Sequence, residues 1–390
     1  MPILLLLLLL QPPQLSQAAT LSGYAKLPAD TFVPGPTSGQ FIEPANNRRP
    51  PFKNQQPVQG FSALIRQDHG TFIVLSDNGF GKRGNSSDYL LGIYHVQPDF
   101  RTANGGEGNI EVSQVIHFSD PDRHMPYPVT RASDRLLTGA DLDPESFRRM
   151  PDGSYWIGEE FNPSLLHISA GGVLLAPPFR LAGLASVDNP QGHPATLGLS
   201  RGFEGMAMSP DGRWLYPMLE GPLLENGEPV TAHGLNIYTF DLQRQQFVNP
   251  GAITPSFRYR LDQGASAIGD FTLYSDTAGL VIERDSKYGT DALVKRLYKV
   301  DFKHLDADGF LFKTLVADLL DIRDPHDLDR DGSDLFKFPF WTIEGLLVID
   351  RTTLGIVNDN NYPFGRARET PDARPDNNEF ILIEVAPLWE

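Results

Sequence analysis

The feature that most constrains the fold is a short motif that recurs along the chain. A polar or acidic residue opens an apolar run, and a tight turn with glycine follows eight residues after it. The three closest copies span residues 62–70, 145–153 and 204–212. In each copy another polar or acidic residue follows the glycine by six to eight positions. This unit is typical of a β-hairpin whose two polar ends lie together, away from the turn.

The repeats predict an all-β fold, and specifically a β-propeller. With two looser copies, the repeats begin near residues 60, 144, 202, 269 and 343, a mean period of about 70 residues that can hold a four-stranded blade with insertions. We favour six blades, because 372 residues after position 18 divided by six is 62; five or seven blades stay open. Segments 21–27 and 379–385 have strand patterns and are expected to pair, closing the ring. A β-sandwich is the alternative.

The two ends and the insertions complete the expected organisation. Residues 1–18 combine a short apolar run with Ser16-Gln17-Ala18, a pattern that predicts a secretory signal. Residues 19–390 are then a single domain, secreted or periplasmic after bacterial export. We expect a long surface insertion over 28–57, a short helix over 315–320 and no integral membrane segment.

Composition excludes several classes of protein. Lys and Arg total 33 against 49 Asp and Glu, a net charge of −16 that argues against nucleic acid as a partner. The chain has no cysteine, so it has neither a disulfide nor a thiolate site. The chain has no Walker A or His-Glu-x-x-His motif, and no Gly-x-Gly-x-x-Gly leads from an expected strand into a helix, so we expect no organic cofactor. A monomer that acts on a small molecule is expected.

The acidic residues of the repeats are the candidate site. A ring of blades brings equivalent positions to one mouth of the channel, where crowded carboxylates require compensating cations. Oxygen ligands of this kind suit Ca²⁺ or another hard divalent cation. The alternative is that each acid only accepts backbone N–H groups within its own blade. The candidate catalytic residues are Glu145, Glu160, Glu204, Glu220, Asp270 and Glu344. The candidate metal ligands from the repeats are Asp77, Glu283 and Asp359.

Two further groups bear on cation and anion binding. Asp327, Asp329 and Asp331 precede Gly332 with the spacing that opens a calcium loop, although Phe338 replaces the closing glutamate of an EF-hand. A solvated acidic turn is the alternative. Lys82, Arg83 and Arg284 lie close to the repeat acids in sequence and are candidate substrate-binding residues for an anionic group.

The repeat segments resemble a known family. Residues 136–174, 202–222, 267–285 and 342–364 together look like the phytase-like family, often labelled "esterase-like activity of phytase". The likeness runs from about residue 60 to residue 384 and implies a secreted β-propeller with acids recurring from blade to blade. It implies that these acids are the active or metal-binding groups of a phosphoester hydrolase. Ser62 departs from the pattern, since other repeats have an acid at its position.

These observations lead to one hypothesis and two alternatives. The first is a secreted, metal-assisted phosphoester hydrolase with an acidic site at the channel mouth. The second is a non-catalytic propeller that binds a ligand or partner and uses calcium only structurally. The third is a lactonase-type propeller hydrolase. Because propellers host all three functions, the fold does not choose between them.

Overall fold

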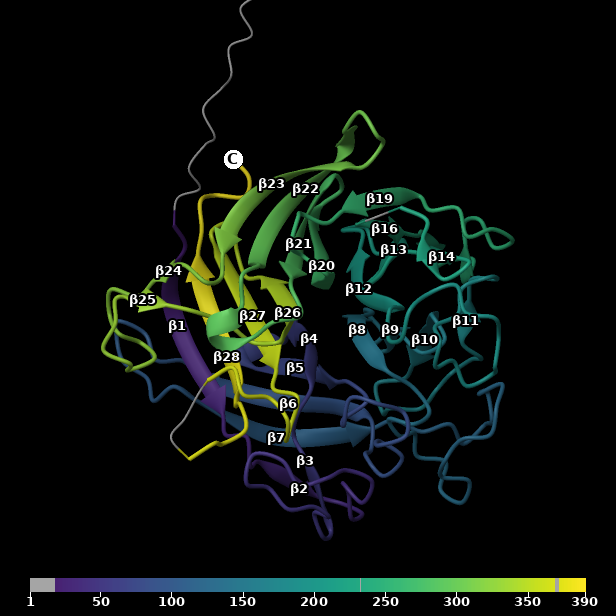
Figure 1. Ribbon diagram of the computed structural model, residues 1–390, viewed down its shortest axis with the longest axis horizontal. Helices are drawn as coiled ribbons and strands as arrows, with labels where there is room; N and C mark the ends of the chain where they lie inside the picture. The colour runs from purple at the N-terminus through teal and green to yellow at the C-terminus, as the bar shows by residue number, and fades with distance from the viewer. Residues whose placement is uncertain (1–17, 232, 369–371) are drawn as a thin grey trace, which may run out of the picture.

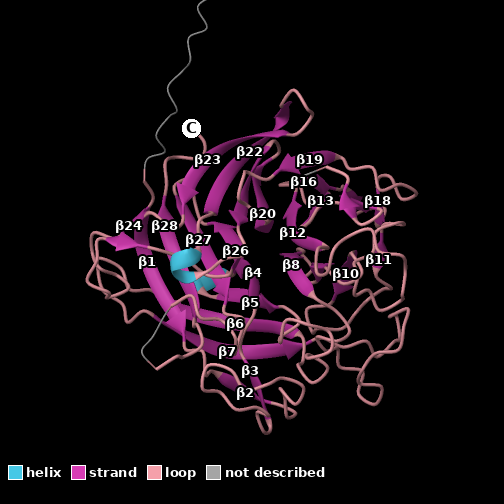
Figure 2. Ribbon diagram, viewed as in Figure 1, coloured by secondary structure: helices cyan, strands magenta, loops and turns pink. Residues whose placement is uncertain are grey.

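Antiparallel sheets surround a central axis in the computed structural model, which describes residues 18–231, 233–368 and 372–390 (Figure 1). The molecule is a β-propeller, and the expectation of an all-β fold is confirmed. Strands dominate, and the described residues contain only the short 3-10 helices η1 (Asp68–Gly70) and η2 (Gly289–Asp291) (Figure 2). The prediction of a helix over 315–320 is wrong, because residues 315–318 belong to strand β23 (Leu311–Asp318). No helix among the described residues is long and apolar enough to cross a membrane.

Each blade starts at the channel with a hairpin from one repeat and continues outward. The first blade contains β4 (Phe61–Arg66), β5 (Phe72–Ser76), β6 (Gly92–Asp99) and β7 (Asn109–His117). The second contains β8 (Pro144–Arg149), β9 (Tyr155–Glu159), β10 (Ser164–Ile168) and β11 (Phe179–Arg180). The third contains β12 (Phe203–Met208), β13 (Trp214–Leu219), β16 (Gly234–Ile237), β17 (Phe240–Asp241), β18 (Gln246–Phe247) and β19 (Phe257–Arg260).

The remaining strands form two more blades and three small additions. The fourth blade contains β20 (Ala267–Ser275), β21 (Ala278–Arg284), β22 (Lys295–Leu305) and β23. The fifth contains β26 (Thr342–Val348), β27 (Thr353–Asp359), β28 (Asn378–Glu384) and, from the other end of the chain, β1 (Thr20–Leu27). The small pairs are β2 (Phe32–Pro34) with β3 (Gln55–Pro57), β14 (Leu224–Glu225) with β15 (Glu228–Pro229), and β24 (Ile322–Arg323) with β25 (Leu335–Phe336).

The innermost strands form a closed circuit of five. Strand β4 contacts β8, β8 contacts β12, β12 contacts β20, β20 contacts β26, and β26 returns to β4. The favoured number of six blades is therefore not confirmed, because the described strands give five, one of the numbers left open. Dividing the chain length by six failed because insertions between blades, including residues 118–143 and 181–202, lengthen each repeat.

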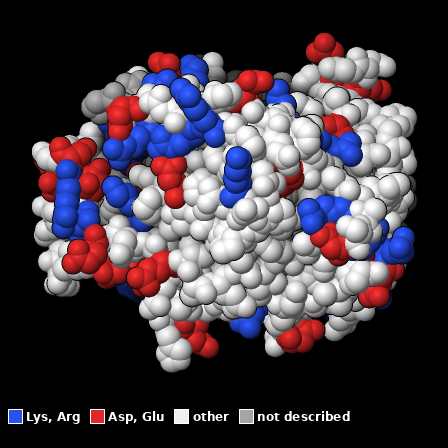
Figure 3. Space-filling model, turned by 90° about the horizontal axis from the view of Figure 1, so that it is seen from below, with Lys and Arg blue, Asp and Glu red and all other residues white. Residues whose placement is uncertain are grey.

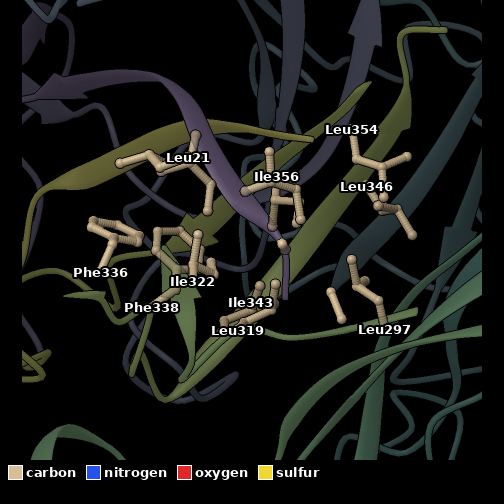
Figure 4. Packing of buried hydrophobic residues seen from close by; sticks show 14 of the residues in the cluster. Leu21, Leu297, Leu319, Ile322, Phe336, Phe338, Ile343, Leu346, Leu354 and Ile356 are labelled. Carbon is tan, nitrogen blue, oxygen red and sulfur yellow. The ribbon is translucent and has the colours of Figure 1, made fainter. Parts of the chain in front are cut away.

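The hydrophobic core is divided among the spaces between neighbouring blades. One cluster joins the fourth and fifth blades through Leu297, Ile343 and Leu354 (Figure 4). Four further clusters fill the other four interfaces between neighbouring blades. Because both faces of a blade are covered, its strands are apolar in long runs, as in Phe72–Ser76, where every residue is buried.

The two ends of the domain meet in the last blade. Strand β1 pairs antiparallel with β28, with Leu21 opposite Ile383 and Lys26 opposite Glu379. The predicted pairing of these segments is confirmed, and β1 also touches β7 of the first blade at Lys26 and Asn109. Sequence-distant strands thus close the ring. Residues 1–17, on which most of the predicted signal lies, are outside the described residues.

Candidate functional site

A β-bulge lies near the start of the inner strand of every blade, at the end that faces the channel mouth. The strand register shifts within the first two pairs of each hairpin, leaving one unpaired residue. The five bulged residues are Ser62, Glu145, Glu204, Gly269 and Glu344. On each second strand, the residue that follows the partner of the last pair before the bulge is Asp77, Glu160, Glu220, Arg284 or Asp359. Bulges commonly re-aim side chains at such sites.

These equivalent positions surround one cavity at the channel mouth. The cavity has a volume of about 530 Å³, and its walls include eight of the ten positions. They are Asp77, Glu145, Glu160, Glu204, Glu220, Arg284, Glu344 and Asp359. Much acidic charge is thus internal, whereas the face in Figure 3 has Lys and Arg intermixed with Asp and Glu. The structure therefore brings together seven of the acids named from the sequence.

The sequence alignment of the fourth repeat was wrong by one residue. It placed Asp270 and Glu283 with the channel acids, but the register gives Gly269 and Arg284 those positions. A shift of one residue turns a strand side chain to the opposite face. Asp270 accepts the N–H of Leu346 at 2.9 Å and lies 3.8 Å from Arg148, so it joins β20 to β26.

The carboxylate of Glu283 also does not line the cavity, and it makes hydrogen bonds and an ion pair elsewhere. Its carboxylate accepts the Tyr259 hydroxyl at 2.5 Å and the Asp262 N–H at 3.0 Å, and it also pairs with Lys313. The two acids therefore stabilise the blades, and their proposed catalytic and metal-binding roles are not supported by their positions.

The three candidate basic residues have different positions. Arg284 is buried in the cavity, and exposed Lys82 lies on its rim. Arg83 is not among the lining residues: its guanidinium donates to the carbonyls of Ala140 at 2.8 Å and Asp188 at 3.4 Å. Arg201, which precedes the third repeat, also lines the cavity.

Arg284 is the internal counter-ion of one half of the cavity. Its Nη2 lies 2.6 Å from Glu220 Oε1, 3.4 Å from Glu204 Oε1 and 3.6 Å from Glu344 Oε1. Arg201 binds the other carboxylate oxygen of Glu220. This guanidinium thus faces three carboxylates from two blades, and it comes from the position that the four other blades fill with an acid.

The other half of the cavity has carboxylates without such a cation. Oxygen atoms of Asp143, Glu145 and Glu160 lie within 4.8 Å of one another, and all three residues are buried. Glu145 Oε2 and Glu160 Oε1 have no hydrogen-bond partner in the part of the chain described. Unpartnered buried carboxylate oxygens are costly, so this donor set fits a hard divalent cation.

Burial alters the acidity of this cluster. It raises the pKa of Asp143 to about 6 and the pKa values of Glu145 and Glu160 well above the usual range, with neighbouring carboxylates adding to the shifts. Asp143 was missed from the sequence because it is not a repeat position. The signal available was its place in Asp141-Leu142-Asp143-Pro144-Glu145, two residues before the bulge.

Asp77 and Asp359 also line the cavity, and their carboxylates already accept hydrogen bonds from other groups of the protein. Asp77 Oδ1 accepts the Gly79 N–H at 2.9 Å and the Gln59 side-chain amide at 3.0 Å. Asp359 accepts the Asn361 N–H at 2.7 Å, and burial raises its pKa to about 6. These contacts make both acids weaker candidates for metal ligands than Glu145 and Glu160, each of which has an unpartnered oxygen.

The predicted calcium loop lies at a different cavity, which Asp329 and Asp331 line. Its converging acids are Asp324, Asp327 and Asp329, whose ligand atoms lie within 4.8 Å of one another. Asp331 instead accepts the N–H of Ser333 at 2.7 Å and is outside this group. The predicted set of Asp327, Asp329 and Asp331 is therefore only partly brought together.

Comparisons with solved structures gave several resemblances at low sequence identity. The PQQ-bound aldose sugar dehydrogenase of Streptomyces coelicolor is 10% identical, with 96% of this chain and 100% of that chain covered and a TM-score of 0.40. The Bacillus subtilis arabinanase is 12% identical, with 84% and 94% covered and a TM-score of 0.39. Regucalcin from Agrobacterium tumefaciens, a calcium-binding protein, is 12% identical, with 85% and 95% covered and a TM-score of 0.38.

A search of curated protein sequences found no match. The family model described as phytase-like, "esterase-like activity of phytase", matches residues 56–362. That range contains all ten channel positions and Asp143. The chain belongs to the phytase-like family.

Proposed function

We propose that this protein is a metal-assisted hydrolase of phosphoesters and that the reaction takes place in the central cavity. The observation that carries the proposal is the cluster of Asp143, Glu145 and Glu160, with two unpartnered carboxylate oxygens, facing the same cavity as Arg284. The family description supports ester hydrolysis. Phosphoryl transfer in particular needs concentrated positive charge around the phosphoryl oxygens.

The proposed roles follow from the two halves of the cavity. Asp143, Glu145 and Glu160 hold one divalent cation, for which calcium is the first candidate. That cation would neutralise phosphoryl oxygens and lower the pKa of the attacking water. Arg284 and Arg201 hold Glu204 and Glu220 in place and supply further positive charge. Export, expected from residues 1–18, would put the protein where calcium is plentiful.

Glu344 is the proposed proton donor. Burial, with the neighbouring Glu204 and Asp359, raises its pKa well above the usual range, which favours the protonated form that a general acid requires. In hydrolysis the water gives up one proton to solvent as its oxygen forms a bond to phosphorus, the ester P–O bond breaks, and the leaving alcohol takes up a proton. A protonated carboxyl on the cavity wall can supply that proton as the P–O bond breaks.

A hydrolysis screen tests the proposal directly. Phosphomonoesters, phosphodiesters, phytate, carboxylic esters and lactones would each be offered with calcium and with a chelator. We expect turnover of phosphoesters that the chelator abolishes. Turnover of lactones alone would favour a lactonase-type enzyme, and no turnover of any class would favour a binding protein.

Two matched variants locate the cation. Glu145→Gln removes a ligand with an unpartnered oxygen, so we expect calcium binding to be lost and kcat to fall at least about a hundredfold. Glu204→Gln removes a carboxylate that already has Arg284 as its partner, so calcium binding should persist. Calorimetric titration of both variants measures this difference. Equal calcium binding by Glu145→Gln and the wild type would place the cation elsewhere.

A further inference from the structure

The rim of the cavity carries large apolar side chains that the proposed chemistry does not use. Leu199, Trp341 and Phe364 line the cavity, and they remain 55%, 43% and 37% exposed. They come from three separate connections between strands. Single exposed apolar residues are common, but several around one mouth mark a binding surface.

Phe364 is held in place by a distant segment. The side-chain amide of Asn46 donates to the carbonyl of Pro363 at 2.8 Å and to that of Phe364 at 3.0 Å. Asn46 belongs to the insertion over 28–57. Phe32 and Phe52, at its two ends, pack on Tyr362 with ring centroids 5.8 and 5.6 Å away. The insertion therefore supports one side of the rim.

Trp341 is also positioned by its neighbours. Its ring stacks on Tyr288 with centroids 5.9 Å apart and an angle of 29° between the planes. Its carbonyl accepts a hydrogen bond from Lys295 Nζ at 3.2 Å. A fixed, half-exposed pair of aromatic rings gives a flat surface on which a planar or apolar group can stack with little loss of entropy.

The charge of the cavity limits what can enter beneath this rim. Eight carboxylates line it: Asp77, Asp143, Glu145, Glu160, Glu204, Glu220, Glu344 and Asp359. The basic lining residues are Lys82, Arg201 and Arg284 alone. Both arginines are already paired with carboxylates. A ligand with many negative charges would meet uncompensated repulsion, whereas a single negative charge can be matched by one cation.

We propose that the substrate is a phosphodiester with one negative charge and an apolar or aromatic ester group, which the rim of Leu199, Trp341 and Phe364 binds. This inference rests on the proposed function and adds the class of substrate to it. A diester has one ionised phosphoryl oxygen, whereas monoesters and polyphosphorylated alcohols carry more. The rim binds the organic group, and the phosphoryl group enters the cavity and lies beside its carboxylates.

Binding of inert analogues tests the rim separately from catalysis. Methyl(phenyl)phosphinate and dimethylphosphinate both carry one charge, contain no ester bond and differ only in the ring. With calcium present, calorimetry should show about tenfold tighter binding of the phenyl compound. Phenylphosphonate, mostly a dianion at mildly alkaline pH, should bind more weakly than methyl(phenyl)phosphinate.

Variants assign the preference to the rim. Trp341→Ala should remove most of the difference between the two phosphinates and leave the affinity for dimethylphosphinate unchanged. Trp389→Ala is a matched control, because Trp389 is 41% exposed and stacks on Tyr274 but does not line the cavity. It should keep the preference, as should Trp341→Phe, which retains a ring if Trp341→Ala folds poorly.

Two results would overturn the inference, and they differ from failure of the proposed function. Equal binding of the two phosphinates, or an unchanged preference in Trp341→Ala, would remove the rim from substrate binding while hydrolysis remained. Tighter binding of the dianion would contradict the charge argument. If no phosphinate binds and no ester is hydrolysed, the proposed function fails and this inference fails with it.

Discussion

At the scale of single residues, Arg284 decides how the acidic cavity is balanced. Four blades have an acid at its position, so a chain without this arginine would have a nearly continuous ring of carboxylates. Its guanidinium contacts Glu204, Glu220 and Glu344. Glu145 and Glu160 each keep one carboxylate oxygen without a hydrogen-bond partner among the described residues. If the proposed cation binds at Glu145 and Glu160, Arg284 would take the place of a second one.

This interpretation predicts a change in metal stoichiometry. Wild-type protein should bind one calcium ion in the cavity, and Arg284→Gln should bind two, since Glu204 and Glu344 lose their ion-pair partner and Glu220 keeps only Arg201. Without calcium the variant should lose about 3–5 kcal/mol of stability, the usual result of breaking a buried ion pair on one side. Calorimetric titration and chemical denaturation measure the two effects.

Arg201→Gln is the matched control for that variant. Arg201 is partly exposed and bridges only Glu220, so its loss should cost less stability and leave one calcium ion bound. If Arg284→Gln also binds a single ion, the guanidinium does not replace a cation.

At the scale of elements, the bulge that opens each inner strand governs the site. In the fourth blade the bulged residue is Gly269, and a Cβ atom there would lie 1.8 Å from the carbonyl oxygen of Ile343. Strands β20 and β26 approach each other closely at this point. No side chain fits, which explains why the bulge of this blade contributes no carboxylate to the cavity.

Gly269→Ala should consequently destabilise the protein by more than about 2 kcal/mol, because backbone and not a flexible side chain must move. Denaturant melts give the value. Gly171→Ala serves for comparison, since the nearest atom to its Cβ is Ser169 Oγ at 3.8 Å, and its stability should change little. Similar small effects at both positions would show that the β20–β26 contact is looser than described.

Asp270, which joins β20 to β26, should make the free energy of unfolding depend on pH. Burial raises its pKa from 3.8 to about 7, so the folded protein keeps a proton that the unfolded chain releases. The stability contributed by this group must fall as the pH rises from about 4 to about 7 and then stay level. Compared with Asp270→Asn, wild-type protein should lose roughly 1–4 kcal/mol more over this range.

Denaturant melts at several pH values test this expectation. Asp276→Asn changes an exposed aspartate in the turn of the same hairpin, and its pH profile should follow the wild type. A parallel profile for Asp270→Asn would mean that Asp270 stays ionised in the fold, held by Arg148.

At the scale of the whole molecule, closure depends on strand β1. It supplies the outer strand of the fifth blade and touches the first blade, so residues from both ends of the chain share one sheet. A propeller without this strand would expose the edge of β28 and the apolar side chains that β1 covers, including Phe380 and Ile383.

A chain that begins at Pro28 should therefore fail to fold cooperatively, whereas one that begins at Ala19 should melt like the full-length domain. Circular dichroism during heating distinguishes them. A sharp transition in the shorter chain, at a temperature close to that of the longer one, would show that the ring closes without β1.

The sequence alone determined the hairpins and most of their acids. Apolar runs, Asp-Gly turns and the eight-residue spacing depend on neighbouring residues, and local pattern is enough to predict them. The pairing of the first and last strands was also predicted, because both segments have strand patterns without partners nearby. Seven acids identified by these rules, from Asp77 to Asp359, do line one cavity.

Only the tertiary structure decided which residue of the fourth hairpin faces that cavity. A bulge changes the phase of a strand by one residue, so Gly269 and Arg284, not Asp270 and Glu283, occupy the channel positions. Asp143 joins the site from outside the repeats, and five inner strands close the circuit because insertions absorb the remaining length. These outcomes depend on packing between blades, which cannot be predicted from the sequence of a single hairpin.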